Sequence, residues 1–328
     1  SSVTFFLSLF NVADDTAVIF RSRGELQTHG LGLIDLLADF GMDCHKATAN
    51  TIAAGESPKT AIIYITPQGQ NKHLAVDRSP MPAGPDQFIP CVESYTYLGA
   101  LLHHTLSDDP EIQQRMQKAN GYFGFLRQRI LASRTTHRST KKLLFESMVM
   151  AILLYGSESW IITKNMERQL TSLHRRFVRA MSGVNMFTTR KHKIRAADLE
   201  KRLGIKSMRD YLDARILGYA GHMARMPPSR LPHMIFFSTC KGSRPVGAPP
   251  LNYERQLRAI CKRKGHPRHS SWLNTAADRE KWRTFTHTPT PCTLRPYHDY
   301  TGRRIQKVIG NQTHGGTVLG EGIFESIP

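Results

Sequence analysis

The stretch Phe10-Asn11-Val12-Ala13-Asp14-Asp15-Thr16-Ala17-Val18-Ile19-Phe20 places two acidic residues between two short apolar runs. Hydrophobic runs on either side of a tight polar centre predict a β-hairpin. Its tip would present Asp14 and Asp15 together, and their like charges repel unless a cation lies between them. Mg²⁺ takes oxygen ligands and would relieve this repulsion. A solvated polar turn is the simpler explanation of the Asp-Asp pair taken alone. The choice between such a turn and a metal site therefore depends on the rest of the sequence.

Four further stretches follow the hairpin: Tyr95–Gly99 (YTYLG), Leu154–Trp160 (LYGSESW), Leu217–Pro227 (LGYAGHMARMP) and Ala277–Arg283 (ADREKWR). Together with Val12-Ala13-Asp14-Asp15, they resemble segments of the reverse transcriptase of non-LTR retrotransposons, most like the RTE-type clade, and they occur in the same order. Val12 stands where that family has an aromatic residue. The resemblance covers residues 3–283 and does not extend to the last 45 residues.

The resemblance implies an RNA-directed DNA polymerase that uses an RNA template, a DNA primer or target, deoxynucleoside triphosphates and Mg²⁺, in the nucleus and cytoplasm. Asp14 and Asp15 match the palm motif that binds Mg²⁺. Lys46 is a weak match to the lysine proposed to protonate the leaving pyrophosphate, and an ordinary surface lysine is the simpler interpretation. The primer-grip strand would supply Tyr95, Tyr97 and Gly99, whose alternative is an edge strand that packs its tyrosines on a sheet.

Two-metal nucleotidyl transfer needs carboxylates from two strands. In the family, the second carboxylate comes from a motif upstream of the hairpin, which this sequence does not contain. We therefore expect a carboxyl-terminal fragment of the enzyme that is inactive alone. The alternative is a non-catalytic nucleic-acid-binding remnant of a transposable element.

Charge is distributed unevenly along the 328 residues. The net charge is +19, but residues 1–110 hold 6 Lys/Arg against 12 Asp/Glu, whereas residues 111–328 hold 39 against 14. A basic region of this size predicts a polyanionic partner such as nucleic acid. The five cysteines are odd in number and widely spaced, which argues against a disulfide framework and favours a reducing, intracellular compartment. No run reaches the roughly 18 apolar residues that a membrane span needs.

These patterns predict an α+β chain: a partial palm of β-hairpin, helix and short antiparallel strands, followed by an all-α basic thumb and connection domain. The expected parts are the palm end at 1–106, the helical domain at 107–240, a basic linker with a helical segment at 241–285, and a poorly ordered tail at 286–328. In the first part, a helix is expected over 25–40. Strands are expected near 60–66, 89–92 and 95–102, with a loop at 69–90.

Apolar residues at helical spacing predict three basic helices after Ser107. The first starts near Asp108, and the third covers 165–181. The second covers 140–155 and is apolar on almost every side, so it should be the buried centre of a helical bundle. Further helices are expected over 194–203, 208–226 and 251–263. The first three would carry the phosphate-binding residues Arg115, Lys118, Arg127, Arg129, Lys141, Lys142, Arg168, Arg175, Arg176 and Arg179. A zinc site from Cys261, His266 and His269 is less favoured than a basic loop, because a fourth ligand at zinc-like spacing is absent.

Overall fold

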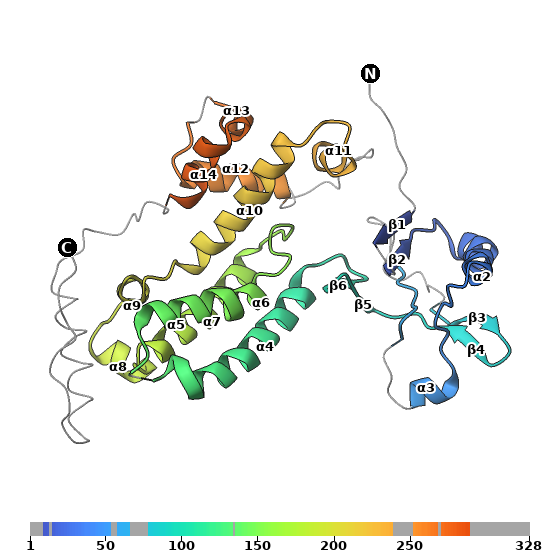
Figure 1. Cartoon of the computed structure of the whole chain (residues 1–328), viewed down its shortest axis with the longest axis horizontal. Helices are drawn as coiled ribbons and strands as arrows, with labels where there is room; N and C mark the ends of the chain where they lie inside the picture. Colours follow the sequence, from blue (N-terminus) through green and yellow to red (C-terminus); the bar gives the residue numbers. More distant parts are fainter. Residues whose placement is uncertain are drawn as a thin grey trace. The chain divides into compact units, whose positions relative to one another are not determined.

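The computed structural model describes residues 9–12, 15–53, 58–65, 78–133, 135–238, 252–267 and 270–288. The chain divides into two compact units, unit 1 at residues 1–111 and unit 2 at residues 112–328 (Figure 1). The predicted linker at 243–250 and the predicted tail beyond Thr288 lie outside the described residues. None of the described helices is long and apolar enough to cross a membrane.

The strands of unit 1 form three antiparallel hairpins. The first pairs β1 (Leu9–Val12) with β2 (Asp15–Val18), as predicted, and Ala13 and Asp14 between them lie outside the described residues. The second pairs β3 (Met81–Gly84) with β4 (Gln87–Ile89). The third pairs β5 (Ser94–Tyr97) with β6 (Ala100–His103).

Three predictions for unit 1 were wrong. The expected loop at 69–90 contains the β3–β4 hairpin. The expected single strand at 95–102 is the β5–β6 hairpin, because Leu98 and Gly99 have φ values of +48° and +79° and form a two-residue turn. The expected strand at 60–66 is reduced, within the described residues, to one isolated bridge between Ile62 and Cys91.

The helix predicted over 25–40 is confirmed. It consists of α1 (Arg23–Glu25), the π-helical segment η1 (Leu26–Gly30) and α2 (Leu31–Asp39), followed by Gly41 at φ +76°. Along this helix Leu26, Leu33 and Leu37 are half-buried, whereas Leu36 and Phe40 are 52% and 74% exposed, and α2 contains no fully buried residue. A short helix, α3 (Ala49–Ala53), follows, and the buried hydrophobic residues described in unit 1 are Ala47, Met81 and Ile89.

The described part of unit 2 is helical throughout. Its elements are α4 (Asp109–Leu126), η2 (Arg127–Leu131), α5 (Arg138–Leu144), η3 (Phe145–Met150), α6 (Ala151–Leu153), α7 (Lys164–Met181), α8 (Met186–Lys191), α9 (Ala196–Leu203), α10 (Met208–Arg225), α11 (Leu231–Phe237), α12 (Tyr253–Arg263), α13 (Trp272–Ala277) and α14 (Arg279–His287). The helices predicted at 165–181, 194–203, 208–226 and 251–263 are confirmed as α7, α9, α10 and α12.

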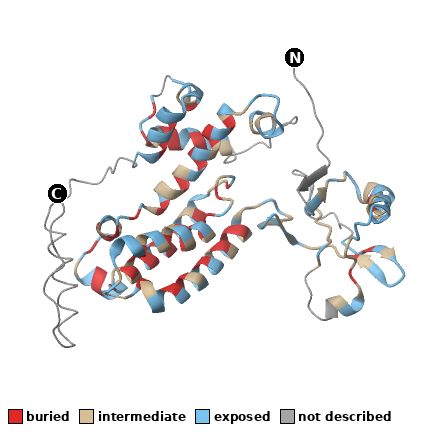
Figure 2. Cartoon of the chain, in the orientation of Figure 1, coloured by how far each residue is buried: buried red, intermediate tan, exposed pale blue. Residues whose placement is uncertain are grey.

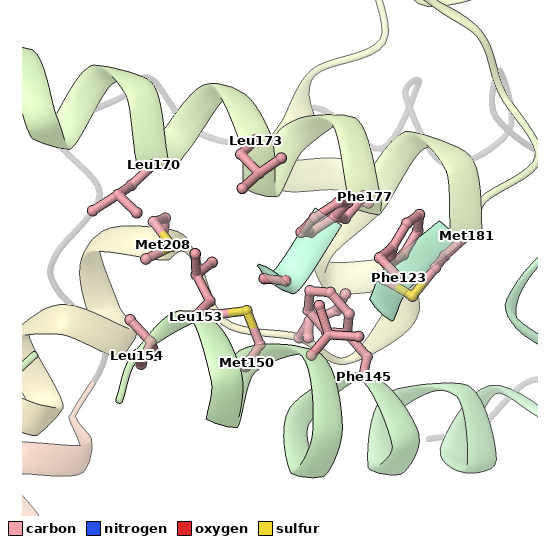
Figure 3. Close-up of a cluster of buried hydrophobic side chains, with 14 of the residues drawn as sticks. Phe123, Phe145, Met150, Leu153, Leu154, Leu170, Leu173, Phe177, Met181 and Met208 are labelled. Carbon is pink, nitrogen blue, oxygen red and sulfur yellow. The ribbon is translucent and has the colours of Figure 1, made fainter. Parts of the chain in front are cut away.

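A first core lies between α4, α7 and the η3 segment (Figure 3). Phe123 stacks on Phe177 with ring centroids 4.1 Å apart. Phe145 meets these two rings edge-on, at centroid distances of 6.5 and 6.2 Å. Buried positions recur along one side of these helices, as the colouring in Figure 2 shows, so the apolar seams read from the sequence are the packed faces.

The helix predicted over 140–155 exists as the continuous run of α5, η3 and α6, but the expectation that it is buried on almost every side was wrong. Phe145, Val149 and Leu153 are fully buried, whereas Leu143, Ser147 and Ala151 are exposed. Residues four apart lie above one another on a helix, so the three exposed residues form one open face. The run therefore lies at the side of the bundle.

A second core packs α10 against α12, α13 and α14. The indole Nε1 of Trp282 donates a hydrogen bond to the Leu217 carbonyl oxygen at 2.8 Å. Gly221 permits this contact, since a Cβ atom there would lie 2.0 Å from Trp282 Nε1. Two of the stretches that carry the family resemblance, Leu217–Pro227 and Ala277–Arg283, thus pack against each other.

A third such stretch, Leu154–Trp160, is held against α12 by hydrogen bonds from side chains of α12 to its backbone. The Tyr253 hydroxyl donates to the Glu158 carbonyl oxygen, and Gln256 Nε2 donates to the Trp160 carbonyl oxygen, both at 2.8 Å. The backbone N–H of Ile162 returns a hydrogen bond to Gln256 Oε1 at 2.7 Å. These three stretches therefore act together in holding the second core and the segment before α7 in place.

A candidate nucleic-acid interface along helix α7

The residues predicted for a polymerase palm all fall in unit 1. Asp15 is the exposed first residue of β2, and Asp14 lies outside the described residues. The Tyr95 hydroxyl donates a hydrogen bond to the Lys59 carbonyl oxygen. Burial, and secondly the negative charge of Asp15, raise the pKa of Tyr95, which places the start of β2 in the electrostatic neighbourhood of β5.

The other palm candidates are not gathered as predicted. Tyr95 and Tyr97 share a half-buried face of β5, but Gly99 lies in the turn beyond it and does not share that face. Lys46 is half-buried beside Ala47, whose backbone N–H and carbonyl pair with Phe88 at 2.9 Å each. None of the contacts described for unit 1 joins Lys46 to Asp15.

The described residues do not by themselves complete a metal site. Within them, no group of three or more His, Cys, Asp or Glu side chains is arranged to hold a metal ion. Asp14 lies outside this part of the chain, so Mg²⁺ at the hairpin stays a prediction. His266 Nε2 is hydrogen-bonded to Thr275 Oγ1 at 3.0 Å, which occupies one of the nitrogens considered for zinc, and His269 is not described.

Helix α7 presents three faces with different tasks. Its apolar face, with Met166, Leu170, Leu173, Phe177 and Met181, is buried in the first core. A second face meets α4 through hydrogen bonds of Gln169 with Gln113 at 2.5 Å and of Arg176 with Asn120 at 2.6 Å. The third face is open to solvent.

The open face of α7 lines a groove with a volume of about 640 Å³. Its walls come mostly from residues three or four apart on α7, with one residue from α8 and one from α10. They are Lys164, Glu167, Arg168, Thr171, Ser172, Arg175, Arg179, Met186 and Arg209. Five of these side chains are cationic and one is acidic, so the lining of this α7 groove carries an excess of positive charge.

The charge balance inside the α7 groove leaves an excess of positive charge. The single carboxylate, Glu167, is paired with Arg209. Burial lowers the pKa of Arg179, and the charges of Arg175 and Arg176 lower it further. Arginine remains protonated at neutral pH, so this lowering of the Arg179 pKa reflects the cost of partly burying a charged guanidinium and, secondly, its repulsion by Arg175 and Arg176. A bound phosphate would relieve that repulsion.

The structure separates the ten basic residues predicted to contact phosphate. Arg168, Arg175 and Arg179 line the α7 groove, whereas Arg176 is turned toward α4. Arg115 and Lys141 are only 7% and 8% exposed, which disfavours the predicted phosphate contacts at these two positions. The Arg115 guanidinium lies 4.4 Å from the centre of the Tyr155 ring.

The remaining four predicted residues do not line the α7 groove. The Lys118 ammonium donates to Gln114 Oε1 at 3.0 Å, and the Arg129 guanidinium lies 4.3 Å from the centre of the Phe125 ring. Arg127 is exposed on η2, and Lys142 is half-buried near Gly204. The sequence reading missed Lys164 and Arg209. Lys164 precedes Arg168 by one helical turn, which was a usable signal, whereas Arg209 comes from a different helix.

Comparison with known proteins gives one informative match. A protein of Caenorhabditis elegans described as transposon-derived is 25% identical over 194 residues, which are 58% of this chain and 69% of that protein. The likeness indicates a transposable-element origin. No family model matches the chain, and no solved structure matches it.

The comparison supports an origin and not a function. The match carries no further detail of activity or ligand. The chemistry of the α7 groove therefore has to support the functional argument by itself.

Proposed function

We propose that the α7 groove binds the sugar-phosphate backbone of a nucleic-acid duplex, and that unit 2 is the thumb side of a non-LTR retrotransposon reverse transcriptase. The observation that carries the proposal is the alignment of Lys164, Arg168, Arg175 and Arg179 on one open helix face. At 1.5 Å per residue, these positions span about 22 Å along the helix axis, which is long enough to reach several phosphates of one strand.

The groove suits backbone binding better than base reading. Guanidinium groups pair with phosphate through two N–H donors in a fixed planar geometry. Contacts of this kind position a duplex without reading its sequence. A polymerase has to accept any template, so a groove dominated by Arg and Lys fits the proposed role.

The binding proposal is tested with the whole chain on an RNA–DNA hybrid duplex at several salt concentrations. Release of counterions makes log K fall linearly with log salt, by about 0.9 per neutralised phosphate on B-form DNA. Replacing Arg175 and Arg179 with Ala is expected to weaken binding and to reduce that slope by up to about two such units.

A matched control removes the same charge elsewhere. Arg255 and Arg258 are exposed on α12, outside the α7 groove, and replacing both with Ala lowers the net charge equally. The control is expected to keep the wild-type slope within error. Equal losses in the two double variants would show that net charge, and not the α7 groove, drives binding.

The second candidate function is a non-catalytic nucleic-acid-binding protein retained from a transposable element. The transposon-derived relative is compatible with both candidates. Sequencing the 5′ end of the transcript separates them. An open reading frame that continues upstream and encodes an Asp-bearing strand supports the polymerase. A start codon directly before the codon for Ser1 supports the binding protein.

A further inference from the structure

Helix α8, at one end of the α7 groove, is built with its polar residues inside and its large apolar residues outside. Thr188 and Thr189 are buried, whereas Met186 and Phe187 are 49% and 71% exposed. Phe187 is among the most exposed large apolar side chains described in the chain. Met186 and Phe187 are neighbours in sequence, and Met186 lines the α7 groove, so α8 presents two large apolar side chains to water beside that groove.

The hydrogen bonds of α8 fix this inverted arrangement. The backbone N–H of Thr188 donates to Asn185 Oδ1 at 2.7 Å, which caps the helix. The Thr189 hydroxyl donates to the Met186 carbonyl oxygen at 2.8 Å, so the buried hydroxyl is satisfied. The cap fixes the start of α8 and the Thr189 hydroxyl has a partner within the helix, while Phe187 lies on the exposed side of α8.

The surroundings of Phe187 are cationic. Met186 and Arg179 both line the α7 groove, and Phe187 follows Met186 directly. The Lys191 ammonium lies 6.0 Å from the centre of the Phe187 ring, and the neighbouring Arg190 is exposed. An aromatic face among cations suits a ligand that is both anionic and aromatic, which describes an unpaired nucleotide.

We propose that Phe187 is a stacking platform for an unpaired base at the α8 end of the α7 groove. The inference rests on the proposed function of that groove, since the phosphates of the same strand would lie on Arg175 and Arg179. Any base offers a π-face, so the stacking is tolerant of sequence. The α7 groove would therefore prefer a duplex with a single-stranded extension over a blunt duplex.

The test compares a blunt hybrid duplex with the same duplex carrying a short single-stranded extension, using the whole chain. Stacking of one base on an aromatic side chain corresponds to about 5- to 150-fold in affinity. The wild-type chain should prefer the extended duplex by a factor in this range. Phe187→Ala should lose the preference while keeping the affinity for the blunt duplex, and Phe187→Trp should retain the preference, with its fluorescence quenched on binding.

A second exposed phenylalanine provides the matched control. Phe125 on α4 is 52% exposed and lies under the Arg129 guanidinium, but it does not line the α7 groove. Phe125→Ala should leave the preference for the extended duplex unchanged. An equal effect of Phe125→Ala and Phe187→Ala would overturn the assignment of the platform to α8.

The remaining outcomes separate the two proposals. If wild-type chain binds both duplexes equally and the Arg175/Arg179 variant weakens both, the platform is wrong and the groove proposal stands. If neither duplex binds, both proposals fail. A Phe187→Trp emission that shifts to the blue with anionic phospholipid vesicles, but does not respond to the extended duplex, would show that this surface faces lipid and would also overturn the platform.

Discussion

At the residue scale, the contact between Gly221 and Trp282 shows that the packing of two separated sequence motifs requires a residue without a Cβ atom. The Trp282 indole is 2% exposed and donates to the Leu217 carbonyl oxygen of α10. Both residues belong to stretches that carry the family resemblance, but the local sequence contains no reason for a glycine at one position and a tryptophan at the other. The reason is steric, and it required the packing of α14 against α10, which no local pattern contains.

Replacing Gly221 with Ala should destabilise the chain. The new Cβ would lie 2.0 Å from Trp282 Nε1, so the indole has to move and its hydrogen bond to Leu217 is lost. Overpacking of this kind costs about 1–3 kcal/mol or more.

Gly218 on the same helix is the control, because a Cβ there meets nothing within 4 Å. Gly218→Ala should be neutral or stabilise by up to about 1 kcal/mol. Urea melts that place both variants at the same midpoint would contradict this packing.

Cys261 should be a slow target for alkylation. Burial, and secondly the negative charge of Asp213, raise the pKa of the Cys261 thiol to about 11 from an ordinary 9.0. Only the thiolate reacts, so near neutral pH the reactive fraction is reduced by about 100-fold relative to the unfolded chain. Iodoacetamide labelling read by peptide mass spectrometry, with and without guanidinium, measures the ratio. Equal rates in the two states would show that the thiol is neither buried nor shifted.

At the element scale, helix positions were predictable because apolar residues recur at helical spacing, and the seam of α7 is buried as that spacing requires. The direction in which each basic side chain points was not predictable from the sequence. Arg175 and Arg176 are neighbours in sequence but occupy different faces of α7, one in the groove and one against α4. Apolar periodicity identifies the inward face, but it cannot say which outward residues a neighbouring helix covers.

The run of α5, η3 and α6 gives a test with two leucines on one element. Leu153 is fully buried in the first core, and Leu143 is 65% exposed on the open face. Leu153→Ala should cost about 2–5 kcal/mol through lost transfer energy and a cavity, whereas Leu143→Ala should change stability by less than about 0.5 kcal/mol. Urea melts of both variants measure the difference. If Leu143→Ala lowered the free energy of unfolding as much as Leu153→Ala, the helix would have to be surrounded by other elements on all sides.

At the scale of the whole molecule, the charge split was visible in the sequence, with acidic residues concentrated before residue 110 and basic residues after it. The α7 groove was visible only in part, since Met186 and Arg209 come from elements that no single periodic pattern joins to α7. Closure of the groove depends on how α8 and α10 pack around α7. That packing is set by the first core and not by the charged residues themselves.

The distribution of buried residues predicts that the two units differ in local stability. In unit 1, the buried hydrophobic residues described are Ala47, Met81 and Ile89, whereas unit 2 has two extended clusters. Segments that bury little apolar surface open at low free energy and exchange their amide protons quickly. Hydrogen exchange followed by mass spectrometry on the whole chain should therefore show amides in 15–53 and 78–103 exchanging at least about 100-fold faster than those in α4, α7 and α10.

The Leu153→Ala variant is the internal control for this experiment. It should speed amide exchange in the helices of unit 2 and leave the exchange rates in 15–53 unchanged. Equal protection of the two units in the wild-type chain would mean that unit 1 is stabilised by contacts beyond those of its own described residues.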